Sequence, residues 1–211
     1  MKRIISIVLA TCIIGNTVAW SDGSTGGKPF YTQRKNMDHE AWLWTELSLY
    51  SPSDEITAGI LSYFWRESQY RSDAVAGCYI SLAGYGRDLC KEMVEKIDPG
   101  IVDGSTKKKF IKLVRKYGGY GLGQWRSQSY LEGLYDLAVE RQMSIGDAAL
   151  QCEFIFKSLQ ENKELWKKLC RCKDAERAGR LISIYYDGSQ SAAPYIGYKA
   201  GRLYMKYHEE D

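Results

Sequence analysis

The sequence predicts a mostly α-helical fold, and three observations lead to this prediction. The 211 residues are 45% hydrophobic and 13% aromatic, which is enough apolar material for one sizeable core but not for two full domains. From Asp38 onward, apolar residues recur at helical spacing through most of the chain. No two strong strand patterns lie close enough together to predict a sheet, although a small hairpin fits within the irregular residues 71–120.

The beginning of the chain predicts a secretory signal peptide over residues 1–19. A short basic start precedes an apolar stretch from Ile4 to Ile14, and small residues follow near the expected cleavage point. An uncleaved signal that tethers the domain to a membrane is the alternative, although the apolar run is short for a span. Residues 20–37 are rich in Gly, Ser and Lys and predict a flexible leader. The folded domain is therefore expected over residues 38–211.

The charge balance argues against a nucleic-acid-binding protein. The full chain carries 29 basic and 26 acidic residues. Removal of the predicted signal takes away Lys2 and Arg3, so the mature charge is 27 − 26 = +1. Because nucleic-acid-binding domains are expected to be strongly basic, neither DNA nor RNA is expected as a partner.

Helical stretches follow one another along the domain, separated by turn residues. The first is expected to begin at a cap formed by Asn36 or Asp38 and to end near Pro52. The second runs from Asp54 to about Gln69. Further helical stretches are expected over residues 89–97, 107–117, 127–141, 146–160, 174–186 and 195–207.

The irregular part of the chain ends in a glycine-rich segment, Gly118-Gly119-Tyr120-Gly121-Leu122-Gly123-Gln124-Trp125. Each glycine weakens a helix by about 0.8–1 kcal/mol relative to alanine, so no stable helix is expected here. Glycines permit tight turns and close backbone approach, as the wall of a cleft requires. An ordinary glycine loop is the alternative interpretation.

One carboxylate on the second helix lies where ionisation is costly. Advancing 100° per residue from Ile56 brings Glu67 back to within about 20° of the same direction. It therefore projects from an apolar stripe that includes Ile60, Tyr63 and Phe64. Desolvation raises the pKa of such a carboxyl group, which suits a proton donor near neutral pH. A structural glutamate paired with a buried arginine or with backbone amides is the alternative.

Three ordered segments carry a resemblance: Ala58-Gly59-Ile60-Leu61, Arg66-Glu67-Ser68 and Tyr120-Gly121-Leu122-Gly123-Gln124-Trp125. The similarity continues through Asp103–Thr106 and Ser183–Gly188 and covers roughly residues 38–207. Together these segments resemble the phage tail lysozyme family of the lysozyme-like superfamily. The resemblance implies a lysozyme-like helical domain that cleaves peptidoglycan at the β-1,4 bond between N-acetylmuramic acid and N-acetylglucosamine.

The same resemblance implies roles for individual residues. Glu67 is expected to protonate the glycosidic oxygen, and Tyr120 and Gln124 are expected to line the sugar cleft. Trp125 offers an apolar face to a sugar but suits the core at least as well.

A tyrosine near the end of the chain is a further candidate for the site. Tyr186 lies on a buried stripe of its helix, and its Tyr-Asp-Gly step resembles the Tyr-Asn-Ala-Gly corner of lytic transglycosylases. We therefore expect Tyr186 to hydrogen-bond Glu67, with Tyr185 as the alternative if the helix phase differs by one residue.

Glycosidases usually need a second carboxylate, and its distance from the acid sets the stereochemistry. Asp73, just beyond the second helix, and Asp187, after Tyr186, are the two candidates, although Asp73 also suits a turn cap. If neither faces Glu67, one acid can act alone, as in lytic transglycosylases, where a substrate hydroxyl closes an anhydro ring. Hydrolysis and transglycosylation therefore both stay open. No metal-ligand spacing such as His-Glu-x-x-His occurs, and we expect neither a metal nor a cofactor.

The cysteines predict disulfides in an exported protein. Cys78–Cys90 is the first pair expected, and Cys152 with Cys170 or Cys172 is the second. Small buried thiols are the alternative.

Two other functions compete with glycan cleavage. A cysteine amidase or endopeptidase acting on stem peptides needs a Cys nucleophile with a His nearby, and Cys152 with His39 is the pair on offer. A non-catalytic cell-wall binding or assembly module is the other. Glycan strands of peptidoglycan are the expected partner in either the enzyme or the module. The signal peptide indicates a secreted or cell-envelope protein, acting alone or within a larger envelope or secretion assembly, with a virion tail as the alternative.

Overall fold

A computed structural model describes residues 39–75, 93–97 and 100–208. The predicted signal peptide, the leader and the expected Cys78–Cys90 pair lie outside the described residues. Within the described ranges the chain forms helices and no strand, so the prediction of a mostly α-helical fold is confirmed. No hairpin forms in the described part of residues 71–120. Isolated bridges join Val75 to Tyr120 and Tyr120 to Trp125, next to and within the glycine-rich segment.

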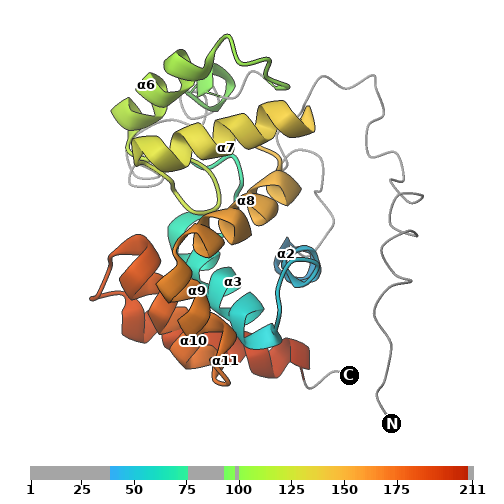
Figure 1. Cartoon of the computed structure of the whole chain (residues 1–211), viewed down its shortest axis with the longest axis vertical. Coiled ribbons are helices and arrows are strands. Elements are labelled where there is room, and N and C mark those ends of the chain that lie inside the picture. The colour runs from blue at the N-terminus through green and yellow to red at the C-terminus, as the bar shows by residue number, and fades with distance from the viewer. Residues whose placement is uncertain (1–38, 76–92, 98–99, 209–211) are drawn as a thin grey trace, which may run out of the picture.

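The helices follow the predicted order closely, with one addition (Figure 1). The addition is α9, which the sequence analysis did not predict, although the Asn162 side chain caps its first turn by accepting a hydrogen bond from the backbone N–H of Leu165. Residues 93–97 are also helical. The elements are α2 (His39–Ser48), α3 (Asp54–Ser68), α6 (Lys107–Tyr117), α7 (Gln128–Arg141), α8 (Ala148–Glu161), α9 (Lys163–Cys170), α10 (Ala175–Ile182), the π-helix η2 (Ser183–Asp187) and α11 (Ala193–His208).

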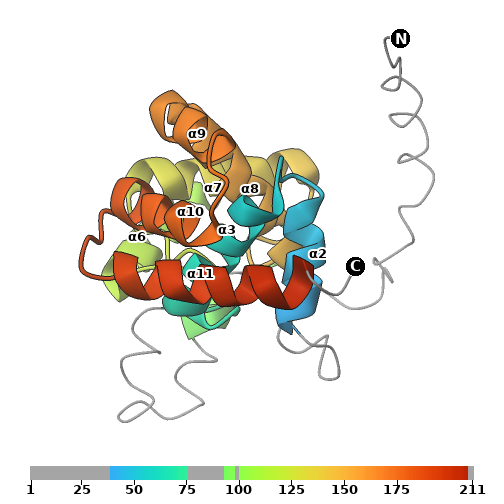
Figure 2. The ribbon, with the colours of Figure 1, turned by 90° about the horizontal axis from the view of Figure 1, so that it is seen from below.

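Helix α3 lies at the centre of the domain. Asp54 and Glu55 in its first turn favour the positive end of the helix dipole, and every residue from Ile56 to Phe64 is buried. α2, α10 and α11 all pack against it, as Figure 2 shows from below. The helix ends at Ser68 because Gln69 adopts a left-handed conformation, with φ at 50°. Glu67 is therefore held in the last turn of a helix that is fixed on several sides.

Small residues set how closely α3, α10 and α11 approach one another. A Cβ atom on Gly59 of α3 would lie 3.0 Å from the backbone nitrogen of Gly179 on α10. A Cβ atom on Gly179 would in turn lie 3.0 Å from the Cβ atom of Ala200 on α11. Because real Cβ atoms rarely approach this closely, the spacing of the three helices requires glycine at both positions.

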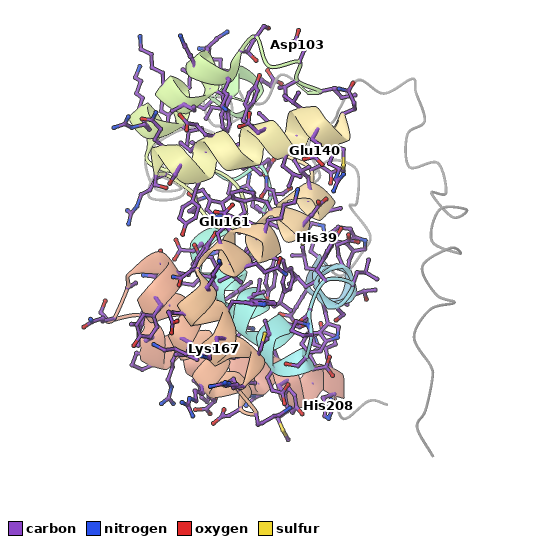
Figure 3. The ribbon with its side chains drawn as sticks, in the orientation of Figure 1. His39, Asp103, Glu140, Glu161, Lys167 and His208 are labelled. Carbon is purple, nitrogen blue, oxygen red and sulfur yellow. The ribbon has the colours of Figure 1, made fainter. Side chains whose placement is uncertain are left out.

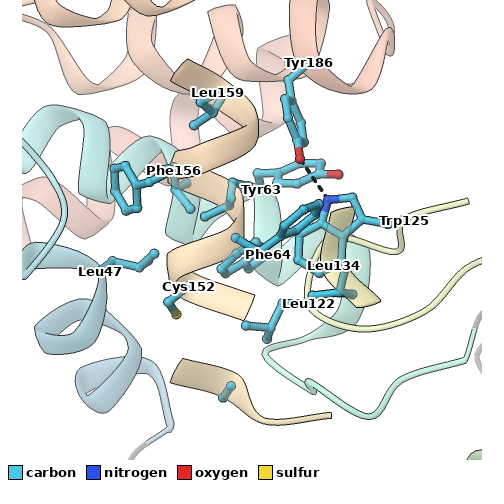
Figure 4. Packing of buried hydrophobic residues seen from close by; sticks show 14 of the residues in the cluster. Leu47, Tyr63, Phe64, Leu122, Trp125, Leu134, Cys152, Phe156, Leu159 and Tyr186 are labelled. Carbon is cyan, nitrogen blue, oxygen red and sulfur yellow. Dashed lines mark hydrogen bonds between the residues drawn. The ribbon is translucent and has the colours of Figure 1, made fainter. Parts of the chain in front are cut away.

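Trp125 joins the glycine-rich segment to the core (Figure 4). Its indole is 2% exposed and contacts Phe64 and Phe154 edge to face, with ring centroids 6.4 and 5.1 Å apart. Of the two interpretations open for Trp125, the structure supports the one that makes it a core residue.

The three described cysteines are free thiols. The predicted pairing of Cys152 with Cys170 or Cys172 is therefore wrong. Cys152 points into the core from α8, whereas Cys170 is exposed at the end of α9, so the two side chains face different environments. Cys152 and Cys172 are buried, in agreement with the alternative of small buried thiols. In the described part of the chain, no helix combines the length and the apolar character needed to cross a bilayer.

Candidate active site

A polar pocket of about 510 Å³ opens where α3 ends. Three segments that are distant in sequence line it: the last turn of α3, the glycine-rich segment and the connection between η2 and α11. Three of the predicted site residues, Glu67, Gln124 and Asp187, come together here. The lining residues are Arg66, Glu67, Gly118, Gln124, Arg126, Asp187, Gly188, Ser189, Gln190 and Ser191.

A second hollow of about 530 Å³ lies on the outer side of α10 and α11. Two of its carboxylates have structural partners: Asp174 caps α10 by accepting from the backbone N–H of Arg177, and Glu176 pairs with Arg180 at 2.7 Å. We therefore place the candidate site in the pocket that contains Glu67.

The environment of Glu67 favours its protonated form. The side chain is 15% exposed. Burial raises the pKa of Glu67 above its usual range, and the negative charge of Asp187 raises it further. The guanidinium of Arg66, which forms an ion pair with Glu67, and the charge of Arg126 act in the opposite direction. The raised pKa is in the direction that the helix phase predicts.

Asp187 faces Glu67's pocket because the helix containing it ends in a π-helical turn. The backbone N–H of Gly188 donates to the carbonyl of Ser183, five residues earlier, and Gly188 then turns the chain with φ at 77°. Burial raises the pKa of the half-buried Asp187 carboxyl group, while Arg66 and Arg126 lower it. The pocket thus holds two carboxylates and two guanidinium groups.

Asp73, the other candidate for a second carboxylate, does not line the pocket. Its buried carboxyl group lies 3.4 Å from the Nε atom of Arg71, and burial raises its pKa. Gln69 and Tyr70 adopt left-handed conformations, with φ at 50° and 67°. These two residues redirect the chain directly after α3, and a short separation in sequence therefore does not bring Asp73 to Glu67.

Tyr186 is buried as predicted, but its hydrogen bonds differ from the prediction. Its hydroxyl group accepts from the indole N–H of Trp125 at 2.8 Å, as Figure 4 shows, and lies 2.7 Å from the hydroxyl oxygen of Ser158. Neither partner is Glu67. Tyr185 does not take that place either, because its ring is 52% exposed and lies under the ammonium group of Lys168. Tyr186 therefore supports the pocket indirectly, by holding Trp125.

The two residues expected to line a sugar cleft differ in position. Tyr120 is fully buried and packs edge-on against Phe110, so its side chain belongs to the core and not to the pocket wall. Gln124 lies in the wall with φ at 46°. Its Nε2 atom donates to the carbonyls of Ala74 and Gly121 at 3.0 and 2.9 Å. Its Oε1 atom is buried and has no hydrogen-bond donor among the described residues.

Gln151 is a residue of the site that the sequence analysis missed. This fully buried amide donates to the carbonyls of Ser72 and Ile145 at 2.8 and 2.7 Å, and it accepts from the N–H of Leu122 at 2.7 Å. A Cβ atom on Gly121 would lie 2.5 Å from the Gln151 Oε1 atom. The hydrogen bonds of Gln151 therefore link the glycine-rich segment to the loops that contain Ser72 and Ile145. They hold in place the segment that supplies Gln124 to the pocket wall. Helical periodicity could have indicated this residue, because Gln151 is a polar residue on the buried face of α8 that it shares with Ile155 and Ser158.

The surroundings of Cys152 do not suit a nucleophile. Its thiol is fully buried, and burial raises its pKa well above the usual range, whereas a reactive cysteine needs a lowered pKa and access. Among the described residues, no group of three or more His, Cys, Asp and Glu side chains is placed to hold a metal ion.

A part-buried glutamate with a raised pKa, in a pocket at the end of a packed helix, is the kind of group from which enzymes can donate a proton. Residues 41–207, most of the chain, match the family described as phage tail lysozyme, and the protein belongs to this family. The family indicates a lysozyme-like hydrolase with peptidoglycan as its substrate, acting outside the cytoplasm or in a virion tail. Neither the curated proteins nor the solved structures give a significant match.

Proposed function

We propose that the protein cleaves peptidoglycan glycan strands at the β-1,4 bond between N-acetylmuramic acid and N-acetylglucosamine, with Glu67 as the general acid. The observation that carries this proposal is the pairing of Glu67 and Asp187 in one pocket. Burial and the charge of Asp187 both raise the pKa of Glu67, so this carboxyl group retains its proton to higher pH than an exposed glutamate. A retained proton can be given to the glycosidic oxygen as the sugar develops oxocarbenium character.

Asp187 is the better supported candidate for the second carboxylate. Burial raises its pKa on balance, and the charges of Arg66 and Arg126 oppose that shift. The ionised carboxylate is the form that activates water or stabilises a positively charged sugar. Gln124 lines the wall of the same pocket, where hydrogen bonds to the carbonyls of Ala74 and Gly121 hold its side chain. Tyr120 and Tyr186 are buried, and Tyr186 holds the indole of Trp125. Asp73 lies beside Arg71 and outside the pocket.

Hydrolysis is favoured over transglycosylation by the presence of Asp187 beside Glu67, because a second carboxylate can direct water to the anomeric carbon. A lytic transglycosylase would instead leave an anhydro-muramyl end that is one water lighter than a reducing end. Mass spectrometry of the soluble fragments separates the two reactions, and fragments ending only in anhydro sugars would contradict hydrolysis.

The central test is the release of dye from labelled cell walls by the Glu67→Gln variant. We expect turnover to fall by roughly 10²–10⁴-fold, the usual contribution of a general acid, while binding to the walls is retained. Glu161→Gln, at an exposed position at the end of α8, is the matched control and should release dye like the wild type. Normal release by Glu67→Gln would contradict the proposal. Binding of the wild-type protein without any release would favour a non-catalytic wall module.

We also propose that the protein acts outside the cytoplasm, after export by the signal peptide over residues 1–19. The basic and apolar pattern of that segment supports this proposal. The N-terminal sequence of exported protein should begin just after Ala19. An intact N-terminus in the membrane fraction would instead indicate an uncleaved tether, and an intact N-terminus in virions would indicate a tail component.

A further inference from the structure

Helix α6 presents a concentrated positive charge on the surface of the molecule. No acidic residue occurs between Lys107 and Tyr117. Five of its basic residues are exposed to solvent, and they are called here the α6 cationic face. They are Lys108, Lys109, Lys112, Arg115 and Lys116.

The charges of this face are not neutralised within the described part of the protein. Lys107, at the start of the helix, forms an ion pair with Asp136 at 2.7 Å. None of the five residues of the α6 cationic face forms an ion pair with a described carboxylate; Lys116 lies over the ring of Tyr117. The mature chain carries a net charge of only +1 (27 − 26), so the charge of this helix is a local feature. A binding partner with several negative charges would complement it.

The apolar side of α6 is already occupied. Phe110 and Val114 are buried, and the ring of Phe110 packs against Tyr120 and Tyr135 with centroids 5.9 and 5.5 Å apart. A basic helix that binds a bilayer inserts an apolar face between the lipids, and α6 has no such face to offer. The arrangement therefore favours a partner that is recognised by charge alone.

The C-terminal end of α6 adjoins the pocket. The helix ends at Tyr117, and its capping residue Gly118 lines the pocket together with Glu67 and Arg126. Figure 3 shows side chains tipped with nitrogen projecting outward from α6, away from the core. An α-helix of this length extends about 16 Å, so a polymer that leaves the pocket on this side meets a row of positive charges.

We propose that the α6 cationic face binds the carboxylates of the stem peptides carried by the glycan strand that is cleaved in the pocket. This inference rests on the proposed function, and it predicts tighter binding of glycan strands that still bear their peptides than of strands without them. The stem peptides are attached to the same sugars as the scissile bond and carry free carboxylates at regular intervals. A row of lysine and arginine side chains beside the pocket would hold such a strand while Glu67 acts on it.

The test compares two variants that lose the same charge at different places. The first, the α6 variant, combines Lys108→Gln, Lys109→Gln, Lys112→Gln and Arg115→Gln. The second, the α9 variant, replaces four exposed cations in and after α9: Lys163→Gln, Lys167→Gln, Arg171→Gln and Lys173→Gln. Lys167 is labelled in Figure 3, well away from α6. Circular dichroism and thermal unfolding should show that both variants fold like the wild type, since every substituted side chain is exposed.

Binding is measured on purified cell walls, with each variant in the Glu67→Gln chain to limit degradation. Exposed ion pairs contribute little individually, so the loss of four should weaken binding by the α6 variant on the order of tenfold. The α9 variant should bind cell walls as tightly as the Glu67→Gln chain without further substitutions. The difference should disappear at high salt, where exposed charges are screened, and on walls whose stem peptides have been removed by an amidase.

Turnover supplies a second measurement, made with chains that retain Glu67. On short soluble glycan oligomers without peptides, the α6 variant should turn over at the wild-type rate, while on intact walls it should be slower. Equal losses in the α6 and α9 variants would overturn the inference in favour of a general charge effect. A loss of binding by the α6 variant that persists on peptide-free walls would also overturn the inference. So would a loss that is seen only in binding to vesicles of anionic phospholipid. Failure of the proposed function would be recognised separately, by normal release from Glu67→Gln.

Discussion

The two ends of α3 are built in different ways. Its middle and first half pack against α10 and α11 through the glycines and alanine at positions 59, 179 and 200, so that one helix backbone touches the next. Its last turn faces a pocket whose other walls are loops, held by the side-chain hydrogen bonds of Gln151 and Gln124. The packing of α3 against α10 and α11 depends on the close fit of the helix backbones. The pocket wall depends instead on a small number of hydrogen bonds from buried side chains.

This difference indicates which substitutions should lower the stability of the protein most. Close packing spreads its contribution over many contacts, and a small shift of one helix can accommodate part of a substitution. A buried amide that serves three backbone groups has no substitute, because each group left unpaired costs about 1–3 kcal/mol. Single polar substitutions behind the pocket should therefore have larger effects than single methyl groups between the helices.

The largest effect is expected for Gln151→Leu. The leucine keeps a similar volume but leaves the carbonyls of Ser72 and Ile145 and the N–H of Leu122 without their partner. At about 1–3 kcal/mol for each buried group, the free energy of unfolding should fall by more than about 3 kcal/mol. Urea denaturation measures this change. Gln160→Leu, at an exposed position on the same helix, should change the stability little; comparable losses in both variants would show that Gln151 has no special role.

An intermediate effect is expected for Gly59→Ala. The new methyl group would lie 3.0 Å from the Gly179 backbone nitrogen and 3.1 Å from the carbonyl carbon of Ala178. Backbone atoms cannot rotate away, so α3 and α10 must separate slightly, which should cost about 1–3 kcal/mol and outweigh the gain in helix propensity.

Gly133→Ala on α7 is the matched substitution for Gly59→Ala. Its methyl group would meet only the ring of Phe154, at 3.1 Å, and a side chain can shift. Thermal unfolding should show a lower Tm for Gly59→Ala and little change for Gly133→Ala. The opposite order would mean that glycine packing does not set the helix spacing.

A smaller effect concerns the charges inside the pocket. Asp187→Asn removes a negative neighbour that raises the pKa of Glu67, so this pKa should fall. Arg66→Gln removes the cation that opposes the shift, so the pKa should rise. NMR titration of the Glu67 carboxyl carbon measures both directions. Shifts of the same sign in the two variants would contradict the arrangement of charges described here.

The smallest effect is a pH-dependent difference in stability between wild type and Glu67→Gln. A carboxyl group whose pKa is raised by folding stabilises the native state below its unfolded pKa, and this contribution is lost as the pH rises through its folded pKa. Since burial raises the pKa of Glu67, the wild type should lose stability relative to Glu67→Gln as the pH rises toward neutrality. Thermal unfolding of both proteins across this range tests the sign, and curves that stay parallel would contradict it.

The sequence predicted which face of a helix is buried better than it predicted which residue a buried side chain contacts. Helical periodicity correctly predicted that Tyr186 is buried and that the pKa of Glu67 is raised. Both properties depend only on which face of the helix is turned toward the core. Periodicity did not reveal that Tyr186 bonds Trp125 and Ser158, since the glycine-rich segment and α8, which supply these partners, are brought to Tyr186 by tertiary packing.

The loops were harder to predict than the helices. Nothing in the sequence showed that Gln69 and Tyr70 would both adopt positive φ and take Asp73 away from the pocket, because left-handed conformations are uncommon for such residues. Gln151 could have been found, because it is a polar residue on the buried face of an amphipathic helix, as Glu67 is. Tyr120 was assigned to the cleft by family resemblance, whereas its place in the core follows from contacts with Phe110.

The π-helical turn at Ser183–Asp187 makes this site depend on helix winding as well as on residue type. Such a turn accommodates one more residue than an ordinary α-helical turn does, and here it contains both the buried Tyr186 and the pocket-lining Asp187. If the same residues followed regular α-helical winding, Asp187 would be rotated around the helix by about 100°, the rotation of one residue. A chain with the same residues in a regular helix would keep the fold and yet place a different group opposite the glutamate. The identity of the residues alone therefore does not fix which group faces Glu67.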